Sequence, residues 1–426
     1  MKKVLIVGMG ESGRSVYVSC IQNGDLPFFY DDNFLKIDIN KLLSIIDFAV
    51  LSPAIKLSSP IVKLLKANNI PILPEIEYAF NNIKNINNKT LIGITGTNGK
   101  TTVTTMIQHV LGDDCCSLCG NVGIAITNCI NDIKKYMAIE LSSFQLASIK
   151  DFKVNIACIL NLEPDHLEYH NNLTEYYNSK LNITKNLGKN DFLVVYNGNC
   201  EITSRIKKNN TNIFYFSKHN TLKGCFIKNG TIFFNDGEKI SAVMKVDEDE
   251  IFEHNILNIM AVCTILKICN IDNKTIENRL KTYKYMPYRL EFVRNYNGVK
   301  IYNDSKSTNV ASLKSALKCF RQKQIILIIG GRYKNESFTE VFSEMKNVKC
   351  VYIYGESKCE IIKYAKEVRF SKYISCKNLE EAVDLAMSNL QDVDVLLFSP
   401  ACASFDMYTG YEERGKHFSD LINNYN

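Results

Sequence analysis

Short apolar, β-branched runs alternate with helix-like segments along almost the whole chain. Such continuously apolar runs are typical of parallel strands that are buried on both faces, and the segments between them are long enough to form helical crossovers. The pattern therefore predicts an α/β fold built on parallel sheets. The runs that we read as strands are Val4–Val7, Phe48–Leu51, Leu91–Ile94, Met137–Ile139, Ile156–Leu160, Phe192–Val195, Val299–Tyr302, Ile325–Ile329, Val351–Tyr354 and Val395–Phe398.

The chain has 426 residues, which is more than one ordinary domain holds. Two polar segments, Asn81–Lys89 and Lys281–Arg289, each precede a fresh strand and suggest domain boundaries. We predict a Rossmann-like domain over residues 1–88, a central domain with a phosphate-binding loop over 89–286, and a second Rossmann-like domain over 287–426. Short strands and turns over Asn209–Val246 predict a small antiparallel edge on the central sheet.

Composition excludes several classes of protein. The net charge is +6, from 51 basic and 45 acidic residues without a long basic run, so no nucleic-acid partner is expected. The apolar run at Val4–Gly8 is too short for a secretory signal, and no stretch is long enough for a membrane span. The 15 cysteines are scattered, and Cys115–Cys119 lacks a second pair at zinc-site spacing. We therefore expect buried thiols and a cytoplasmic protein.

The strongest chemical signal is Leu91–Val110, in which a strand, a glycine-rich turn, Lys-Thr-Thr and a helix follow one another. Backbone N–H groups of such a turn, together with a helix N-terminus, bind phosphate. Lys100 is expected to pair with the β- and γ-phosphates, and Thr101 to hold Mg²⁺. The strict phosphate-loop pattern requires glycine where Ile94 stands, but Gly96 and Gly99 still give a permissive turn.

The segment TGTNGKT, Thr95–Thr101, resembles the variant phosphate loop of the Mur ligases and folylpolyglutamate synthases. The resemblance implies an enzyme that activates a carboxylate with ATP and then lets an amine attack it. It also implies ATP contacts from Gly96, Thr97, Asn98, Gly99, Lys100, Thr101 and Thr102.

Downstream, Glu140 and His166 each follow an apolar strand, where α/β proteins bind ligands. A carboxylate and a histidine near a triphosphate are able to hold Mg²⁺. The resemblance implies that Glu140 and His166 are metal-site residues, and that Lys180 is carbamylated and binds a second Mg²⁺. It implies further contacts to the substrate and phosphate from Asn121, Ser142 and Asp165.

Two later motifs match nucleotide contacts of the same family. Asn255 and Asn258, in HNILNIM, would share one face of a helix at spacing i, i+3. Arg289, in MPYRLEF, suits a contact to the transferred phosphoryl, and Asp304 would accept ribose hydroxyls. The resemblance implies that all four bind ATP and that Arg289 is catalytic, as are Lys100, Glu140, His166 and Lys180.

The segments Asn303–Asn309 and Ser399–Gly415 look specifically like the D-glutamate-adding branch of the Mur ligases. A dicarboxylic amino acid needs cationic and N–H donors, which two lysines would supply. Tyr411 stands where the family has phenylalanine, and Ile328–Lys334 departs from the family's pattern. The residues implied to bind D-glutamate are Lys306, Thr308, Lys334, Ser404 and Tyr411.

The pattern GMGESG, Gly8–Gly13, follows the first strand, and Asp31 and Asp32 lie about 20 residues further on. By itself this spacing indicates dinucleotide binding. The resemblance instead implies a UDP-sugar site, with Ser12 and Asp31 or Asp32 near uracil and Ser52 near the diphosphate. Ala54 stands where the family usually has glycine.

The resemblance thus implies an ATP- and Mg²⁺-dependent ligase, expected to be a monomer. It would add D-glutamate to UDP-N-acetylmuramoyl-L-alanine through an acyl phosphate, in peptidoglycan precursor synthesis. A folylpolyglutamate synthase would lack the domain ahead of the loop. An NAD-dependent oxidoreductase, using Gly8–Gly13, would leave Lys100 unexplained, and a non-catalytic nucleotide-binding regulator would not need Glu140, His166 and Lys180 together.

Overall fold

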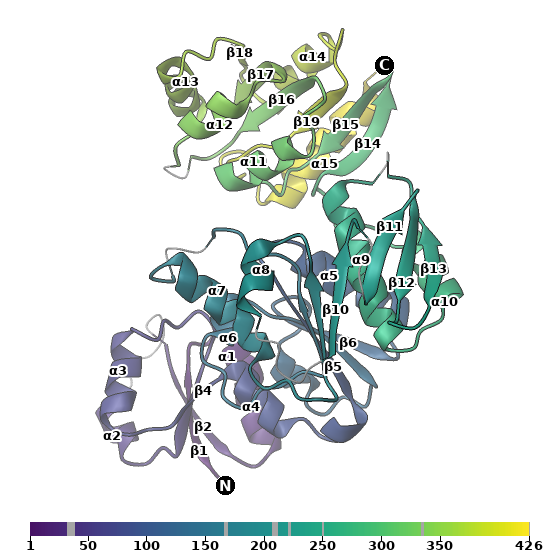
Figure 1. Cartoon of the computed structure of the whole chain (residues 1–426). Coiled ribbons are helices and arrows are strands. Elements are labelled where there is room, and N and C mark those ends of the chain that lie inside the picture. The colour runs from purple at the N-terminus through teal and green to yellow at the C-terminus, as the bar shows by residue number, and fades with distance from the viewer. Residues whose placement is uncertain are drawn as a thin grey trace. The chain divides into compact units, whose positions relative to one another are not determined.

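The computed structural model describes residues 1–31, 39–165, 169–206, 212–219, 223–248, 251–333 and 336–425 (Figure 1). The chain divides into two compact units, Met1–Tyr283 and Lys284–Asn426. The first unit contains two sheets and the second contains one, and in each sheet most neighbouring strands are parallel. The predicted α/β class is therefore confirmed.

The N-terminal sheet has four parallel strands in the order β2-β1-β3-β4. Strand β1 is buried on both faces, since Leu5 and Val7 pack with Leu65 on one side and Val4 and Ile6 pack with Val16 on the other. This is why its sequence is continuously apolar. The elements are β1 (Lys3–Val7), α1 (Glu11–Gln22), β2 (Leu26–Tyr30), α2 (Ile39–Leu43), β3 (Phe48–Leu51), α3 (Pro60–Ala67), β4 (Ile72–Pro74) and α4 (Glu75–Asn82).

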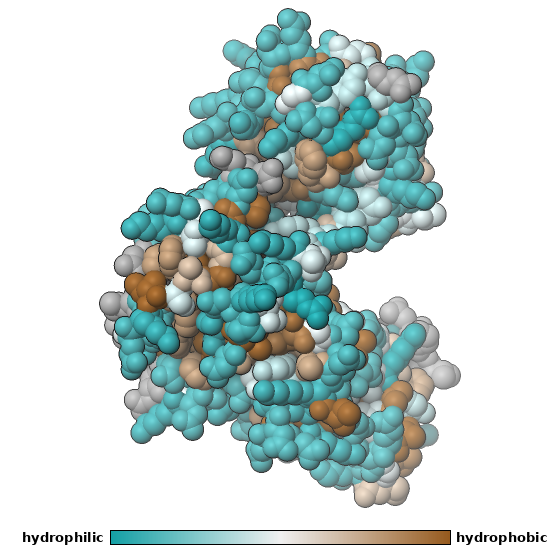
Figure 2. Space-filling view, turned by 90° about the vertical axis from the view of Figure 1, so that its right-hand side faces the viewer, coloured by the Kyte–Doolittle hydropathy of each residue, from teal (hydrophilic) through white to brown (hydrophobic). Residues whose placement is uncertain are grey.

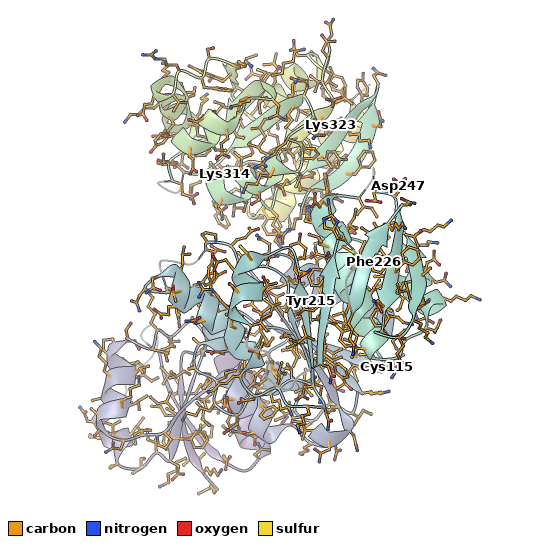
Figure 3. All side chains as sticks on the ribbon, in the orientation of Figure 1. Cys115, Tyr215, Phe226, Asp247, Lys314 and Lys323 are labelled. Atoms are coloured by element: carbon orange, nitrogen blue, oxygen red, sulfur yellow. The ribbon has the colours of Figure 1, made fainter. Side chains whose placement is uncertain are left out.

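The middle sheet has nine strands in the order β13-β12-β11-β10-β9-β8-β5-β7-β6. Strands β11, β12 and β13 pair antiparallel, which confirms the antiparallel edge predicted within Asn209–Val246. Figure 3 labels Tyr215 on β10 and Phe226 on its neighbour β11, where Phe226 stacks on Phe233. The strands are β5 (Thr90–Thr95), β6 (Cys116–Gly120), β7 (Tyr136–Glu140), β8 (Ile156–Ile159), β9 (Phe192–Tyr196), β10 (Asn212–Ser217), β11 (Gly224–Lys228), β12 (Thr231–Asn235) and β13 (Ile240–Lys245).

Helices cover both faces of the middle sheet, and a hydrophobic core lies between the sheet and the helices on each face. Ile92 and Ile94 of β5 face one core, which contains Val103 and Ile259, and Leu91 faces the other. The α-helices are α5 (Lys100–Leu111), α6 (Ser143–Leu146), α7 (Leu173–Leu181), α8 (Cys200–Arg205), α9 (Glu253–Ile268) and α10 (Asn273–Lys281), and the short 3₁₀ helices are Ile86–Asn88, Ile126–Cys129 and Asn182–Thr184.

Two buried carboxylates of α4 join the N-terminal sheet to the middle sheet. Glu77 is fully buried and accepts N–H bonds from Lys150, Asp151 and Phe152, at 2.8, 2.6 and 2.9 Å. Glu75 accepts the backbone N–H of Thr127 at 3.0 Å, and burial raises the pKa of this carboxyl. Buried carboxylates are tolerated only when hydrogen-bonded in this way. The two sheets are thereby joined within one compact unit.

The C-terminal unit is built on a six-stranded sheet in the order β14-β15-β19-β16-β17-β18, parallel except for the β14–β15 pair. Phe398 of β19 stacks on Phe418 of α15 in its core, with ring centroids 4.4 Å apart. Lys314 of α11, labelled in Figure 3, pairs with Glu340 of α12. The elements are β14 (Glu291–Tyr296), β15 (Val299–Asn303), α11 (Val310–Lys318), β16 (Ile325–Gly330), α12 (Thr339–Glu344), β17 (Val348–Tyr354), α13 (Lys358–Glu367), β18 (Tyr373–Ser375), α14 (Leu379–Met387), β19 (Val395–Phe398) and α15 (Tyr411–Asn424).

Every strand predicted from an apolar run lies on a strand of the structure, although the run Ile156–Leu160 extends one residue beyond β8. In Figure 2 hydrophilic residues predominate on the visible face, and hydrophobic residues form only small patches. In the described part of the chain, no helix is both long enough and apolar enough to cross a membrane.

Candidate active site

The phosphate loop runs from Gly96 to Gly99, between the end of β5 and the start of α5. Gly96 and Gly99 have φ angles of +153° and +84°, values that other residues rarely adopt. A Cβ atom on Gly99 would also lie 2.5 Å from Oδ1 of Asn258, so Asn258 packs directly against the loop. Ile94 is a fully buried residue of β5, so it belongs to the strand and the loop begins after it.

Two lysine side chains meet at the carbonyl of Gly96. Nζ of Lys100 donates to the carbonyl oxygens of Gly96 and Thr97, both at 2.9 Å, and Nζ of Lys180 donates to the Gly96 oxygen at 2.8 Å. Lys180 is 1% exposed and lies 4.8 Å from the ring centroid of Tyr176. Burial, together with the charge of Lys100, lowers the pKa of Lys180 to about 7, and the carboxylates of Asp165 and Glu140 oppose this shift.

Glu140, at the end of β7, accepts hydrogen bonds from α5 and from the residue that follows the neighbouring strand β6. Its Oε2 accepts the hydroxyl of Thr101 at 2.8 Å, and its Oε1 accepts Nδ2 of Asn121 at 3.0 Å. A carboxylate beside a hydroxyl at a phosphate loop is an oxygen-donor set that fits Mg²⁺. Within the described ranges, no three His, Cys, Asp or Glu side chains group closely enough to hold a metal. The predicted metal residue His166 lies outside the described residues.

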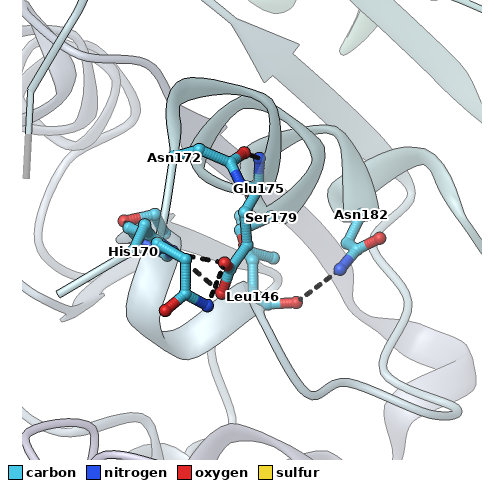
Figure 4. A network of polar contacts seen from close by, with 8 residues as sticks. Leu146, His170, Asn172, Glu175, Ser179 and Asn182 are labelled. Atoms are coloured by element: carbon cyan, nitrogen blue, oxygen red, sulfur yellow. Dashed lines mark hydrogen bonds and ion pairs between the residues drawn. The ribbon is translucent and has the colours of Figure 1, made fainter. Parts of the chain in front are cut away.

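Helix α7 positions Lys180, and it is held at both ends (Figure 4). At its start, Oδ1 of Asn172 accepts the N–H of Glu175 at 2.9 Å and caps the helix. Just beyond its end, Nδ2 of Asn182 donates to the carbonyl of Leu146 in α6 at 3.0 Å. The first bond caps α7 itself, and the second ties the residue that follows α7 to α6.

Three residues that contact the loop, Asn161, Glu163 and Tyr176, were not predicted as site residues. Oδ1 of Asn161 accepts the N–H of Asn98 at 2.7 Å, and its Nδ2 donates to the Asn98 carbonyl at 3.0 Å. Oε2 of Glu163 accepts Nδ2 of Asn98 at 3.1 Å, and the hydroxyls of Thr97 and Tyr176 lie 3.1 Å apart. The position of Asn161 and Glu163 just after β8, which neighbours β5, was the available signal.

The remaining residues of this unit that were predicted to bind ATP or the UDP-sugar substrate differ in burial and position. Asn258 is buried, whereas Asn255, three residues earlier on α9, is half-buried. Thr102 is half-buried in the first turn of α5. Ser142 caps α6 by accepting the N–H of Gln145 at 3.2 Å, just after β7. The structure therefore brings Asn258, Glu140 and Lys180 to the loop. Ser142 lies two residues after Glu140 in the sequence.

The glycine turn after β1 is closely packed. A Cβ atom on Gly13 would lie 1.9 Å from the carbonyl oxygen of Gly8, so only glycine fits there. Oγ of Ser52 donates to the same oxygen at 2.6 Å, and Oδ2 of Asp31 accepts the N–H of Met9 at 2.8 Å. Asp31 and Ser52 thus lie beside this turn, with Ser12 half-buried on it.

Two residues near the predicted UDP site, Asp32 and Ala54, and a cavity beside Ser52 lie in this region of the chain. Asp32 lies outside the described residues, and Ala54 is exposed. A small cavity is lined by Ser52 and Ile55 from the N-terminal sheet and by Phe144, Gln145 and Tyr169 from the middle part. Ser52 therefore lies on the same cavity as residues that directly follow Ser142.

In the C-terminal unit, Asp304 is buried and accepts the hydroxyl of Ser399 at 2.7 Å and the N–H of Leu290 at 3.2 Å. Burial raises its pKa to about 7, although Ser399, Leu290 and Arg289 act in the opposite direction. Arg289 is exposed. The two residues predicted to contact ATP from this unit therefore belong to one local group.

The residues predicted to bind D-glutamate are partly brought together. Nζ of Lys306 lies 5.6 Å from the ring centroid of Tyr411, so the tyrosine supplies the aromatic face expected of phenylalanine. Ser404 is 2% exposed and Thr308 is half-buried. Lys334 lies outside the described residues.

Two family patterns match the chain, the Mur ligase middle domain over residues 94–266 and the Mur ligase glutamate ligase domain over 288–402. Among solved structures, the chain is similar to a pseudomurein peptide ligase type C from Methanothermus fervidus, with a TM-score of 0.60 and 18% identity over 99% of both chains. It is also similar to UDP-N-acetylmuramate–alanine ligase from Thermotoga maritima, with a TM-score of 0.56 and 18% identity over 99% of both chains. These structures establish the fold alone.

The fold and the phosphate-loop site define an ATP-dependent, amide-bond-forming ligase, and the chain belongs to the Mur ligase family. Its curated relatives are UDP-N-acetylmuramoylalanine–D-glutamate ligases. The one from Petrotoga mobilis is 36% identical and covers 99% of both chains. The one from Caldicellulosiruptor bescii is 35% identical over 99% of this chain and 97% of its own, and the one from Clostridioides difficile is 35% identical over 99% and 98%.

Proposed function

We propose that the protein joins D-glutamate to UDP-N-acetylmuramoyl-L-alanine, with cleavage of ATP, in peptidoglycan precursor synthesis. The observation that carries this proposal is full-length similarity to ligases of that name, combined with a phosphate loop on which Lys100 and Lys180 converge. We place the reaction in the cytoplasm, where ATP and nucleotide sugars are available. We also propose that the protein has three domains, with boundaries near residues 88 and 286, and that it is a monomer.

In the first step, the γ-phosphoryl of ATP passes to the L-alanyl carboxylate and leaves ADP. The N–H groups of residues 96–102 would hold the phosphates, with Lys100 turning from the loop carbonyls to the β- and γ-phosphates. Mg²⁺, when bound by Thr101, Glu140 and His166, would offset the charge of the phosphoryl group. Asn255, Asn258, Arg289 and Asp304 would supply the other ATP contacts.

We propose that Lys180 is carbamylated in the active enzyme. Its pKa of about 7 leaves much of the amine neutral at physiological pH, and a neutral amine is the form that reacts with CO₂. The product carries a negative charge and would serve as a further Mg²⁺ ligand. Because Lys180 lies beside Lys100, replacing its ammonium by an anion also removes a like-charge contact.

In the second step, the amine of D-glutamate attacks the acyl phosphate, and the tetrahedral intermediate collapses to the amide and phosphate. Lys306, Thr308, Lys334, Ser404 and Tyr411 would hold the amino acid, its two carboxylates pairing with the lysines. Ser12, Asp31, Asp32, Ser52, Asn121, Ser142 and Asp165 would hold the UDP-sugar substrate. The Ser52 cavity and the Asn121–Glu140 hydrogen bond support this assignment.

The test is phosphate release from purified protein mixed with ATP, Mg²⁺, UDP-N-acetylmuramoyl-L-alanine and D-glutamate, each also omitted in turn. Release should require every component, and the product should carry one added glutamate by mass spectrometry. Turnover with a folate and L-glutamate in place of these substrates, or NAD reduction without ATP cleavage, would refute the proposal. The substitution Lys100→Ala provides an inactive control.

A further inference from the structure

We infer that Arg414 is a positioning residue for the amino-acid site, an inference that rests on the proposed function. Arg414 lies in the first turn of α15, is fully buried and is among the largest buried side chains in the described part of the chain. Its side chain connects the two loops that carry Lys306, Thr308 and Ser404. It would therefore set the distance between the groups that hold D-glutamate.

The guanidinium of Arg414 donates three hydrogen bonds. Nε donates to Oγ of Ser305 at 3.1 Å, and Nη2 donates to the Ser305 carbonyl at 2.8 Å. Nη1 donates to the carbonyl of Cys402 at 2.9 Å. Ser305 directly precedes Lys306 in the loop after β15, and Cys402 lies two residues before Ser404 in the loop after β19. One rigid, planar group thus holds both loops at once.

A third loop also packs against Arg414. Gly331, after β16, has a φ angle of +136°, and a Cβ atom there would lie 3.0 Å from Nη1 of Arg414. Oγ of Ser305 in turn donates to the carbonyl of Tyr411 at 2.8 Å, which ties the first loop back to the start of α15. Arg414 therefore lies under the loops that follow three strands of the C-terminal sheet, where α/β folds bind ligands.

The buried positive charge of Arg414 distinguishes its contacts from ordinary core packing. All three acceptors that Arg414 contacts in the described part of the chain are neutral oxygens. Burying a cation without a carboxylate partner is costly, and an apolar side chain of similar volume would fill the space at lower cost. Next to loops proposed to receive a dicarboxylic amino acid, the buried charge favours an anionic substrate as well as holding the loops.

The experiment compares Arg414→Met and Arg414→Lys with wild type. Methionine keeps an apolar stem and removes charge and bonds, whereas lysine keeps the charge but cannot span both loops. Arg294→Met is the matched control, because Arg294 donates to the carbonyls of Asn423 and Tyr425 at the other end of α15, at 3.3 and 3.1 Å. KM is measured for D-glutamate and for ATP, alongside the thermal unfolding midpoint.

We expect Arg414→Met to raise KM for D-glutamate at least about tenfold and KM for ATP less than about twofold. Arg414→Lys should fall between wild type and Arg414→Met, and Arg294→Met should leave both constants within about twofold. Equal increases in both KM values, or an unchanged KM for D-glutamate in a folded Arg414→Met protein, would overturn the inference. A wild-type enzyme that does not use D-glutamate would instead refute the proposed function itself.

If Arg414→Met does not fold, Ser305→Ala decides the question. This change removes the acceptor of Nε and little volume, so the fold should survive. KM for D-glutamate should then rise about threefold or more, with KM for ATP unchanged. Wild-type KM values in both Ser305→Ala and Arg414→Lys would overturn the positioning role.

Discussion

Replacing Lys180 by methionine is expected to change how stability depends on pH. The pKa of Lys180 falls from 10.5 to about 7 because the ammonium is buried at 1% exposure, which corresponds to about 5 kcal/mol against the charged form. The folded protein therefore releases this proton at a lower pH than the unfolded chain does. Below pH 7 both states are protonated and the full cost of burial is present, and the cost disappears as pH rises toward 10.5.

Methionine cannot be charged, so it avoids this cost at every pH. Relative to Lys180→Met, wild type should gain about 4 kcal/mol in the free energy of unfolding between pH 6 and pH 10. The lost hydrogen bond to Gly96 costs about 1 kcal/mol at all pH values and does not affect the slope.

The assay is urea unfolding of both proteins at several pH values, in CO₂-free buffer without nucleotide. Lys185→Met is the control for the loss of a lysine hydrogen bond, because Lys185 donates to the carbonyl of Ile149 at 2.9 Å from an exposed position. A difference between wild type and Lys180→Met that stays flat from pH 6 to pH 10 would refute the reasoning.

Four further outcomes are expected. Lys100→Ala should lose ligase activity while circular dichroism stays unchanged, and activity within a few-fold of wild type would exclude a catalytic loop. Lys180→Arg should also be inactive, since arginine cannot be carbamylated, and ¹³C-bicarbonate should give a carbamate signal in the wild-type, nucleotide-bound enzyme. D-Glutamate should be turned over and L-lysine and diaminopimelate should not, because a further cation would be repelled by Lys306; equal phosphate release with L-lysine would contradict this. Asp304→Asn should raise KM for ATP. Because burial raises the carboxyl pKa to about 7, this variant should also gain stability over wild type as pH rises from about 4 to 7, and unfolding at pH 4 and pH 8 would show whether it does.

Most of the strands that the sequence predicts are buried on both faces and have continuous apolar runs, and β15, which carries the exposed Lys300, is an exception. Strand β2 contains Pro27, and β6 reads Cys-Ser-Leu-Cys-Gly, so neither stands out from its surroundings. Both lie at an edge of their sheet, where one side needs no partner strand and the demand for apolar residues is lower. Strands β2 and β6 are recognised by their pairing with β1 and β7, and their own composition does not reveal them.

Within the candidate site, the sequence pointed to the residues that lie at strand ends, such as Glu140. The contacts of Asn161 and Glu163 to the phosphate loop depend on β8 lying next to β5, which requires the strand order of the sheet. The burial of Arg414 was equally hidden, because a helix that begins with Tyr411 and two glutamates reads as solvent-exposed. Charge patterns describe surfaces well and buried hydrogen-bonded ions poorly.

The carboxylate of Glu77 determines where this protein can be cut. A fragment starting at Lys89 would leave the N–H groups of residues 150–152 without their acceptor and expose apolar surface that α4 now covers. The apolar surface that the loss of α4 leaves exposed should make such a fragment aggregate or unfold. Limited proteolysis of the native enzyme should instead release a stable piece when it cleaves near Tyr283, where the chain divides into two compact units. Efforts to isolate an ATP-binding fragment should therefore keep the first 88 residues attached.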